Sequence, residues 1–242
     1  MEKDQNPFRV KAYAHLLSLN ILSFAIAITD FTLILSILTY TFEVSAMEIG
    51  YATALYGLPG VIFGVFIGRF SDSRDPFIIL YASVFLKLIV AISLMFAPNV
   101  YFFIFMVFIK GIANTLGVAP GQFLLRAILN DKQLVANNSF MTVAFQLTKI
   151  LAPLVTAAII LSMGMNSFLI SVLLCLLSLP QIYFIKFYHR HIAKMRSSKA
   201  KASIFALYSL LQQKKNYLSF FFLHQWYRHS YYLFTILCFL FF

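Results

Sequence analysis

Apolar residues are gathered into six long stretches along this chain, with short polar segments between them. A helix needs about 17–25 mostly apolar residues to cross the ~30 Å hydrocarbon layer of a membrane, and each stretch is about that long or slightly longer. Because backbone groups in lipid must be bonded within their own segment, the stretches are expected to be helices. The pattern predicts an all-α, polytopic membrane protein with six transmembrane helices. The stretches cover residues 16–42, 49–68, 77–97, 100–121, 138–163 and 167–185.

Basic residues in the connecting segments fall on alternate sides of this predicted bundle. With the amino terminus in the cytoplasm, the outside loops 43–48, 98–99 and 164–166 contain no Lys or Arg. This distribution satisfies the positive-inside rule, so we expect a multi-pass protein with a cytoplasmic amino terminus. The inside segments carry Lys3, Arg9 and Lys11, then Arg69 and Arg74, then Arg126 and Lys132, and finally Lys186, Arg190, Lys194, Arg196, Lys199 and Lys201.

Composition narrows the classes of function. The chain is 61% hydrophobic and 11% charged, with a formal net charge of +11. Most of that charge is the loop bias, which indicates contact with anionic lipid headgroups and not with nucleic acid. Motifs of nucleotide-binding, zinc-hydrolytic or serine-hydrolytic enzymes are lacking, so we expect no enzyme activity and no cofactor. Cys175 and Cys238 have no metal-ligand partners in sequence, so we expect no metal site.

The chain divides into four parts by composition. Residues 1–15 form a cytoplasmic amino terminus, 16–185 the six-helix bundle and 186–202 a basic cytoplasmic linker. Residues 203–242 form a tail rich in Phe, Tyr and Leu that contains no Gly, Pro, Asp or Glu. The apolar pieces of this tail are each too short to span a membrane alone. This abrupt change of composition suits a truncated product whose end is translated out of frame.

Small residues line one face of the second stretch, at Gly57, Gly60, Gly64 and Gly68, and the last three are spaced by four. Such a seam lets the backbones of two helices approach closely. A shorter version occurs at Gly117 and Gly121 in the fourth stretch. Ordinary helix packing explains the seam, and a sliding surface between two moving bundles is the functional alternative.

The segment after the second stretch reads Gly68-Arg-Phe-Ser-Asp72-Ser-Arg74-Asp-Pro. This resembles the signature loop of the major facilitator superfamily. The run from Gln146 to Pro153 resembles the motif that antiporter-type members carry in span five, and Pro120 with the following Arg126 resembles the next cytoplasmic loop. The resemblance covers residues 10–190, the amino-terminal six-helix half, and is nearest to the bacterial drug, macrolide and siderophore efflux branch. It implies a bacterial inner membrane location.

The sequence departs from that family pattern at several positions. Ser73 stands where the loop normally has Arg, and Asp75 and Pro76 replace its closing basic pair. Ala152 replaces the Gly of the span-five motif, and Val107 stands where span four would carry Arg. The departures put the loop and antiporter assignments in question, and leave the six-helix resemblance in place.

The loop has a physical role that does not depend on the family. Asp72 lies at a helix end between Arg69 and Arg74. A carboxylate there can cap a helix or pair with a cation on another bundle, and so latch one conformation. Gly68, Arg69, Asp72 and Arg74 are therefore a candidate conformational-switch loop, and a solvated charged turn is the alternative.

Four ionisable residues lie near the centres of predicted spans, at Asp30, Lys87, Lys110 and Lys149. Each costs roughly 2.5–3.5 kcal/mol on insertion scales, so pairing or a wet cavity is expected. Polar residues at spacings of three and four share a helix face with three of these charges. They are Asn20 and Ser23 with Asp30, Asn114 with Lys110, and Thr142, Gln146 and Thr156 with Lys149.

In the superfamily, spans one, two, four and five line a central cavity. The resemblance therefore implies a substrate or proton pathway formed by Asp30, Lys110, Asn114, Gln146 and Lys149, with Lys87 more peripheral. We expect Asp30 to exchange a proton or face the substrate, and the lysines to attract an anionic or zwitterionic substrate or to hold Asp30 charged. A static Asp–Lys pair that fixes helix register is the alternative.

The resemblance implies secondary active transport of a small molecule, with proton-coupled efflux. Alternating access needs two bundles, and this chain supplies one. A truncated half is the favoured explanation, and a half-transporter that pairs with a second chain or forms a homodimer is another. A non-transporting six-helix scaffold or assembly protein, or a lipid-translocating family member, is the alternative function.

Overall fold

The structure, a computed structural model, describes residues 7–72 and 74–189. Ser73, the linker from residue 190 onward and the tail lie outside the described residues, as do Lys3 and Cys238. No strand occurs in the described part, so the all-α prediction is confirmed there. The elements in chain order are η2 (Pro7–Arg9), α1 (Tyr13–Tyr40), α2 (Ala46–Ile62), α3 (Gly64–Asp72), α4 (Pro76–Met95), α5 (Val100–Ile128), α6 (Asp131–Met163), η3 (Gly164–Phe168) and α7 (Leu169–Tyr188).

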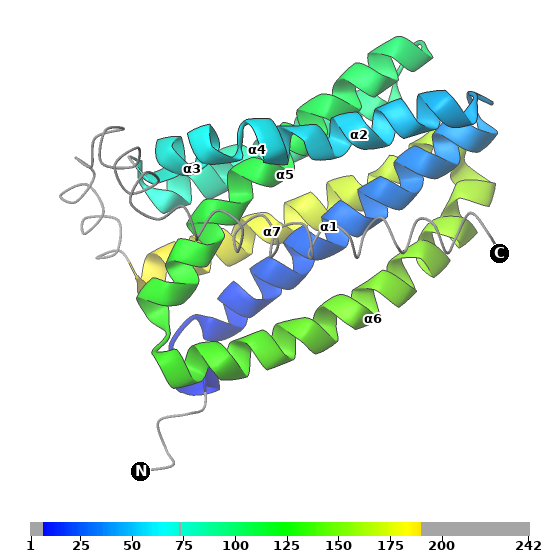
Figure 1. Ribbon diagram of the computed structural model, residues 1–242. Helices are drawn as coiled ribbons and strands as arrows, with labels where there is room; N and C mark the ends of the chain where they lie inside the picture. Colours follow the sequence, from blue (N-terminus) through cyan, green and yellow to red (C-terminus); the bar gives the residue numbers. More distant parts are fainter. Residues whose placement is uncertain (1–6, 73, 190–242) are drawn as a thin grey trace, which may run out of the picture. The chain divides into compact units, whose positions relative to one another are not determined.

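Length and composition give four to five candidate membrane spans among the described residues, against the six predicted. Four helical stretches pass outright, and α2 with α3 makes a fifth if this bent pair is one span. The stretch Asp131–Tyr188 is 58 residues long, or about 87 Å if it were one straight helix. Figure 1 shows that it doubles back at η3, so α6 and α7 run in opposite directions. Gly164, with φ of 52°, ends α6 at this reversal.

Polar side chains set the starts of the long helices. Ser45 and Glu48 form a capping box on α2, and Asn130 and Gln133 form one on α6. Asn99 caps α5. Each cap satisfies backbone N–H groups that a helix start leaves unpaired and contributes about 1 kcal/mol. These residues place the turns of the chain at the ends of the bundle.

The helix after the second loop is capped by a residue other than the predicted one. Asp75 precedes Pro76, and its carboxylate accepts a hydrogen bond from the Phe77 backbone N–H at 2.9 Å. The backbone of Asp72 instead ends α3. Proline suits the first helical position because its missing N–H has no partner there in any case. Asp75 and Pro76 depart from the family motif, and in the structure they form the start of α4.

The second predicted span is broken into α2 and α3, which differ in direction by 50°. Pro59 lies inside α2, and its carbonyl accepts a hydrogen bond from the N–H of Phe63 at the break. Proline disturbs the turn that precedes it, so Pro59 weakens the end of α2, and Gly60 and Gly64, residues that weaken a helix, flank the break itself. The break lies between Gly60 and Gly64, so the predicted glycine seam is divided between two helices.

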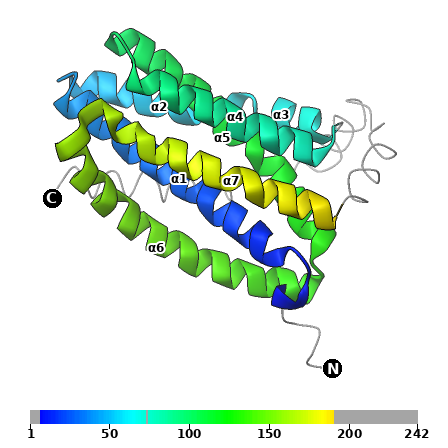
Figure 2. The ribbon, with the colours of Figure 1, turned by 180° about the vertical axis from the view of Figure 1, so that it is seen from behind.

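Packing within the bundle follows the order of the chain only in part. α1 packs on α6 and α7, α4 packs on α5 and α7, and α2 and α3 pack on α5. Figures 1 and 2 show α1 and α7 running side by side from both directions of view. The amino-terminal end of α1 lies beside the carboxyl-terminal end of α7, where the Lys11 carbonyl and the His189 ring are 2.9 Å apart.

Two apolar clusters form the core, one toward each end of the bundle. The first contains Leu16 to Ile26 of α1 with parts of α4, α5 and α7. The second contains Leu33 to Leu38 of α1 with other parts of α4 and α5. The buried polar residues of α1, Thr29 and Asp30, lie between these clusters in sequence. A polar layer therefore separates two apolar layers along the helices.

Among the described glycines, the closest approach to another helix occurs at one that the sequence did not single out. A Cβ on Gly111 of α5 would overlap the carbonyl oxygen of Tyr56 and lie 3.0 Å from Cγ of Pro59. A Cβ on Gly60 would lie 3.6 Å from Oγ1 of Thr115, which is ordinary contact. At Gly57, Gly64 and Gly68 it would meet no described atom within 4 Å. The α2–α5 contact therefore depends on Gly111.

The shorter glycine pair on α5 does meet other helices. A Cβ on Gly117 would lie 2.8 Å from Oγ of Ser83 on α4, and one on Gly121 would lie 3.7 Å from Oδ1 of Asn20 on α1. Pro153, which ends the run that resembles the span-five motif and which we expected to take part in helix packing, lies half-buried inside α6.

Candidate functional site

The centre of the bundle holds a fully buried ion pair between α1 and α5. The ammonium nitrogen Nζ of Lys110 lies 2.9 Å from Oδ2 of Asp30, and both side chains have no exposed surface. Neither Asp30 oxygen accepts a hydrogen bond of good geometry from a described residue. We therefore regard the contact as Coulombic attraction at short distance, without an aligned hydrogen bond.

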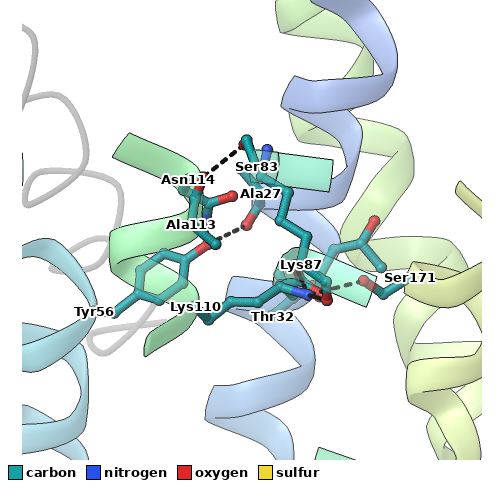
Figure 3. Close-up of polar contacts among 11 residues, drawn as sticks. Ala27, Thr32, Tyr56, Ser83, Lys87, Lys110, Ala113, Asn114 and Ser171 are labelled. Carbon is teal, nitrogen blue, oxygen red and sulfur yellow. Dashed lines mark hydrogen bonds and ion pairs between the residues drawn. The ribbon is translucent and has the colours of Figure 1, made fainter. Parts of the chain in front are cut away.

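Two further helices hold the Lys110 ammonium. Nζ donates to the backbone carbonyl of Lys87 on α4 at 3.1 Å and to Oγ of Ser171 on α7 at 3.3 Å. Figure 3 shows the Lys110 side chain extended toward these two acceptors. An ammonium has three donors, and these two hydrogen bonds use two of them. Lys110 thus joins α5 to α1, α4 and α7 at one point.

Lys87 brings a second amine into the same layer. Its side chain is 4% exposed, and its ammonium makes no hydrogen bond or ion pair with a residue that the structure describes. The layer therefore contains two amines and one carboxylate in a region with little access to water. When all three are ionised, the layer carries one excess positive charge.

A hydrogen-bonded chain lies one helical turn from the ion pair. Nδ2 of Asn114 on α5 donates to the hydroxyl of Tyr56 on α2 at 2.6 Å, and that hydroxyl donates to the carbonyl of Ala27 on α1 at 3.2 Å (Figure 3). Oδ1 of Asn114 and Oδ1 of Asp30 are buried acceptors that no described residue satisfies. Two such acceptors on neighbouring turns favour the binding of a hydrogen-bond donor such as a water molecule, or of a proton.

The family model of the Major Facilitator Superfamily matches residues 16–242. The chain belongs to the Major Facilitator Superfamily. It is therefore a multi-pass membrane transporter by family. The match continues through residues 190–242, beyond the 10–190 that carry the resemblance seen in the sequence. No curated protein matches the chain.

Two of the five pathway residues lie apart from the ion pair in this superfamily member. Gln146 is exposed on α6, and Lys149, on the same helix, is half-buried. Thr156 of α6 is buried and accepts or donates at 3.2 Å from Oγ1 of Thr32 on α1. The structure thus brings Asp30, Lys110 and Asn114 together, and places Gln146 and Lys149 on α6, which contributes no described contact to the ion pair.

The residues of the switch loop lie at the end of the bent helix pair. Gly68 is half-buried and Arg69 is exposed on α3. The Arg74 guanidinium lies over the ring of Phe70, 5.5 Å from its centroid, which is a favourable cation–π distance. The side chain of Asp72 lies outside what the structure describes. Among the described residues there is no group of three or more His, Cys, Asp or Glu that could hold a metal ion.

Sequence reasoning missed two contributors to this site. Ser171 was not recognised, although the buried Ser171, Cys175 and Ser178 follow one helical face of α7, and that small polar stripe was visible in the sequence. Tyr56 gave no signal, because one Tyr among 13 in the chain is unremarkable. The part of Lys87 was underestimated, since it acts through a backbone carbonyl that no side-chain pattern can indicate.

Proposed function

We propose that this superfamily member is a secondary active transporter that couples efflux of a small molecule to protons, and that Asp30 and Lys110 are its coupling pair. The observation that carries the proposal is the fully buried ion pair between two apolar clusters, with acceptors from two more helices. Charges in such a place are costly and are found where ions or substrates pass. The efflux direction and the drug, macrolide and siderophore branch rest on the loop motifs alone.

The charge balance supports a cycle of proton and substrate. Protonation of Asp30 removes its negative charge and leaves the Lys110 ammonium with the Lys87 carbonyl and Ser171. The two amines of the layer then favour an anionic or zwitterionic substrate. Loss of the proton restores the Asp30–Lys110 attraction and displaces that substrate. The same ion pair joins α1 to α5, so its making and breaking changes the contact between two helices.

The bundle is proposed to cross the membrane six times. The carbonyl oxygen of Lys11 and Nε2 of His189 are 2.9 Å apart, so the two ends of the described region lie at the same end of the bundle. Ends on one face require an even number of crossings. Counting α2 with α3 as one span, and α6 and α7 as two, gives six. An inside location of these ends agrees with the positive-inside rule.

Single-cysteine labelling checks this topology. In intact cells, a cysteine in place of Glu48, at the start of α2, is expected to react with a membrane-impermeant maleimide. A cysteine in place of Lys132, at the start of α6, is expected to react only after the cells are opened. The background variant has Cys175 and Cys238 replaced by Ser. Reaction of both positions from the same side would contradict six spans and remove the support for the transport proposal.

A complete cycle needs a second bundle, and we propose that a further six-helix half, on this polypeptide or on another chain, packs against α6. The polar residues Asn138, Thr142 and Gln146 are exposed on the outer side of α6. In a membrane these side chains are better placed against protein or water than against lipid chains. A truncated product that lacks its partner half would expose them. A scaffold has no need of the buried ion pair.

Flux measurements test the proposal directly. The full chain, reconstituted alone in vesicles with a pH-sensitive dye inside, is expected to move protons when a transported macrolide, siderophore or other drug from a panel is added. Asp30→Asn is expected to abolish that signal, by a factor of at least about 10² for loss of a proton-transfer group. Asp131→Asn, the same change at an exposed position on α6, serves as the matched control.

The outcomes of the flux measurement, together with co-expression of a partner chain, separate the alternatives. Undiminished proton-coupled flux in Asp30→Asn would remove Asp30 from the mechanism. Absence of flux with every compound, in a chain that is folded and inserted, would favour the scaffold function or the requirement for a second half. If co-expression with a candidate partner chain restores flux, the chain needs a second half and the scaffold function is contradicted.

A further inference from the structure

A cavity lies at the end of the bundle where α1 begins and α7 ends, more than three helical turns from Asp30 along α1. Its volume is about 490 Å³, which is in the range of sites that bind small molecules. Figures 1 and 2 show these two helix ends side by side. The cavity is lined by Phe8, Val10, Lys11, Ala12, Ala14, His15 and Tyr188.

Contacts between α1 and α7 fix the walls of this cavity. Nδ1 of His15 lies 2.8 Å from Oε1 of Gln181, and because an amide oxygen accepts, Nδ1 carries the proton in this bond. The His15 ring is also stacked on Phe184, with centroids 4.7 Å apart. Nε2 of His15 is not used in either contact, and it would donate to an anion in the cavity when both ring nitrogens carry a proton.

The charge of the cavity is positive. Lys11 is exposed and forms no ion pair with a residue in the described ranges. None of the described residues that line the cavity is acidic, and Lys186 lies in the last turn of α7, two residues before the lining residue Tyr188. Among these described residues, an ammonium and an imidazole without a carboxylate favour an anion.

The remaining lining is aromatic and aliphatic, at the depth where a membrane span meets water. Phe8 is 51% exposed and Tyr188 is 46% exposed, and aromatic residues of this kind gather at the headgroup level of membranes. Val10, Ala12 and Ala14 add an apolar wall. An anion that also carries apolar chains matches both the basic residues and the apolar residues of the lining.

We infer that this cavity binds the headgroup of an anionic phospholipid of the inner leaflet, with the phosphate at Lys11 and His15 and the glycerol backbone against Tyr188 and Phe8. Basic pockets between the cytoplasmic ends of membrane helices bind such headgroups. The lipid fastens the start of α1 to the end of α7. This site is separate from the proposed coupling pair and does not depend on what the protein transports.

Thermal unfolding of the purified full chain in detergent tests the inference. Dioctanoyl phosphatidylglycerol is expected to raise the unfolding temperature in a concentration-dependent manner, since a ligand of the folded state stabilises it. Dioctanoyl phosphatidylcholine and inorganic phosphate are expected to raise it much less. Lys11→Gln is expected to weaken the apparent affinity for phosphatidylglycerol about 5-fold, as removal of one cation near an anionic lipid implies. Lys11→Arg should retain the affinity.

Lys132→Gln is the matched control, because it removes an exposed cation at another cytoplasmic helix start and should leave the affinity unchanged. Equal effects of phosphatidylcholine and phosphatidylglycerol would overturn the anionic headgroup. An equal effect of inorganic phosphate would overturn the lipid as the source of the phosphate. Unchanged affinity in Lys11→Gln, or an equal loss in Lys132→Gln, would overturn the location. The unfolding temperature without lipid shows that each variant is folded.

Discussion

Neutralising only one member of the Asp30–Lys110 pair is expected to destabilise the protein by about 3–5 kcal/mol, because the other charge is left buried without its partner. In Asp30→Asn the Lys110 ammonium keeps only the Lys87 carbonyl and Ser171 as acceptors. In Lys110→Met the Asp30 carboxylate loses its only described ionic partner, at a site with no exposed surface. Thermal or denaturant unfolding in detergent, followed by circular dichroism, measures both variants.

Neutralising both members is expected to recover most of that loss. The double variant Asp30→Asn, Lys110→Met buries no unpaired charge, so its unfolding free energy should fall well short of the sum of the two single effects. The pair Asp131→Asn and Lys132→Gln, at exposed positions, should change stability by less than about 0.5 kcal/mol. Additive effects at positions 30 and 110 would contradict the ion pair. Transport by the stable double variant would reduce the pair to a structural role.

A side chain at Gly111 is expected to separate α2 from α5. Gly111→Ala places its methyl group on the Tyr56 carbonyl oxygen and against the ring of Pro59, so α2 must shift. Overpacking of this kind costs about 1–3 kcal/mol, and a larger side chain costs more. The shift also strains the hydrogen bonds from Asn114 to Tyr56 and from Tyr56 to Ala27. Thermal unfolding measures the loss of stability.

Gly57→Ala is the matched control, because a Cβ there meets no described atom within 4 Å. Replacing a helical Gly by Ala at an open position is expected to be neutral or stabilising by about 0.5–1 kcal/mol. Equal destabilisation by the two variants would contradict the assignment of the tight contact to Gly111. The same reasoning applies to Gly64. A loss of flux in Gly64→Ala without a loss of stability would indicate that this side of α3 meets a second bundle.

The helical class and the central position of Asp30 and Lys110 were predictable because each leaves a periodic or compositional signal. Apolar length marks a span, and a charge near the middle of a span is conspicuous. The choice of Lys110 over Lys149 as the partner of Asp30 was not predictable, because helix rotation and helix neighbours decide it. The sequence places both lysines on polar faces of their helices, and only packing brings α5 to the buried side of α1.

The break between α2 and α3 and the role of Gly111 were also beyond sequence reasoning. Pro59 is evident in the sequence of the second predicted span, but a proline inside a membrane helix is often tolerated without a sharp bend. Four glycines at regular spacing directed attention to α2, whereas the tight contact uses one glycine of α5 that has no such pattern. A close approach depends on the three-dimensional paths of two helices, and the sequence pattern of either helix does not show where the other one lies.

The bond from Lys110 to the carbonyl of Lys87 has a consequence for how this transporter can evolve. The acceptor is a main-chain oxygen, so every helix-compatible residue at position 87 supplies it equally. The anchor of the Lys110 ammonium on α4 therefore does not depend on which side chain stands at position 87. Comparison of related sequences would therefore not reveal this anchor. Substitutions at position 87 would test the side chain of Lys87 and not the carbonyl that accepts from Lys110.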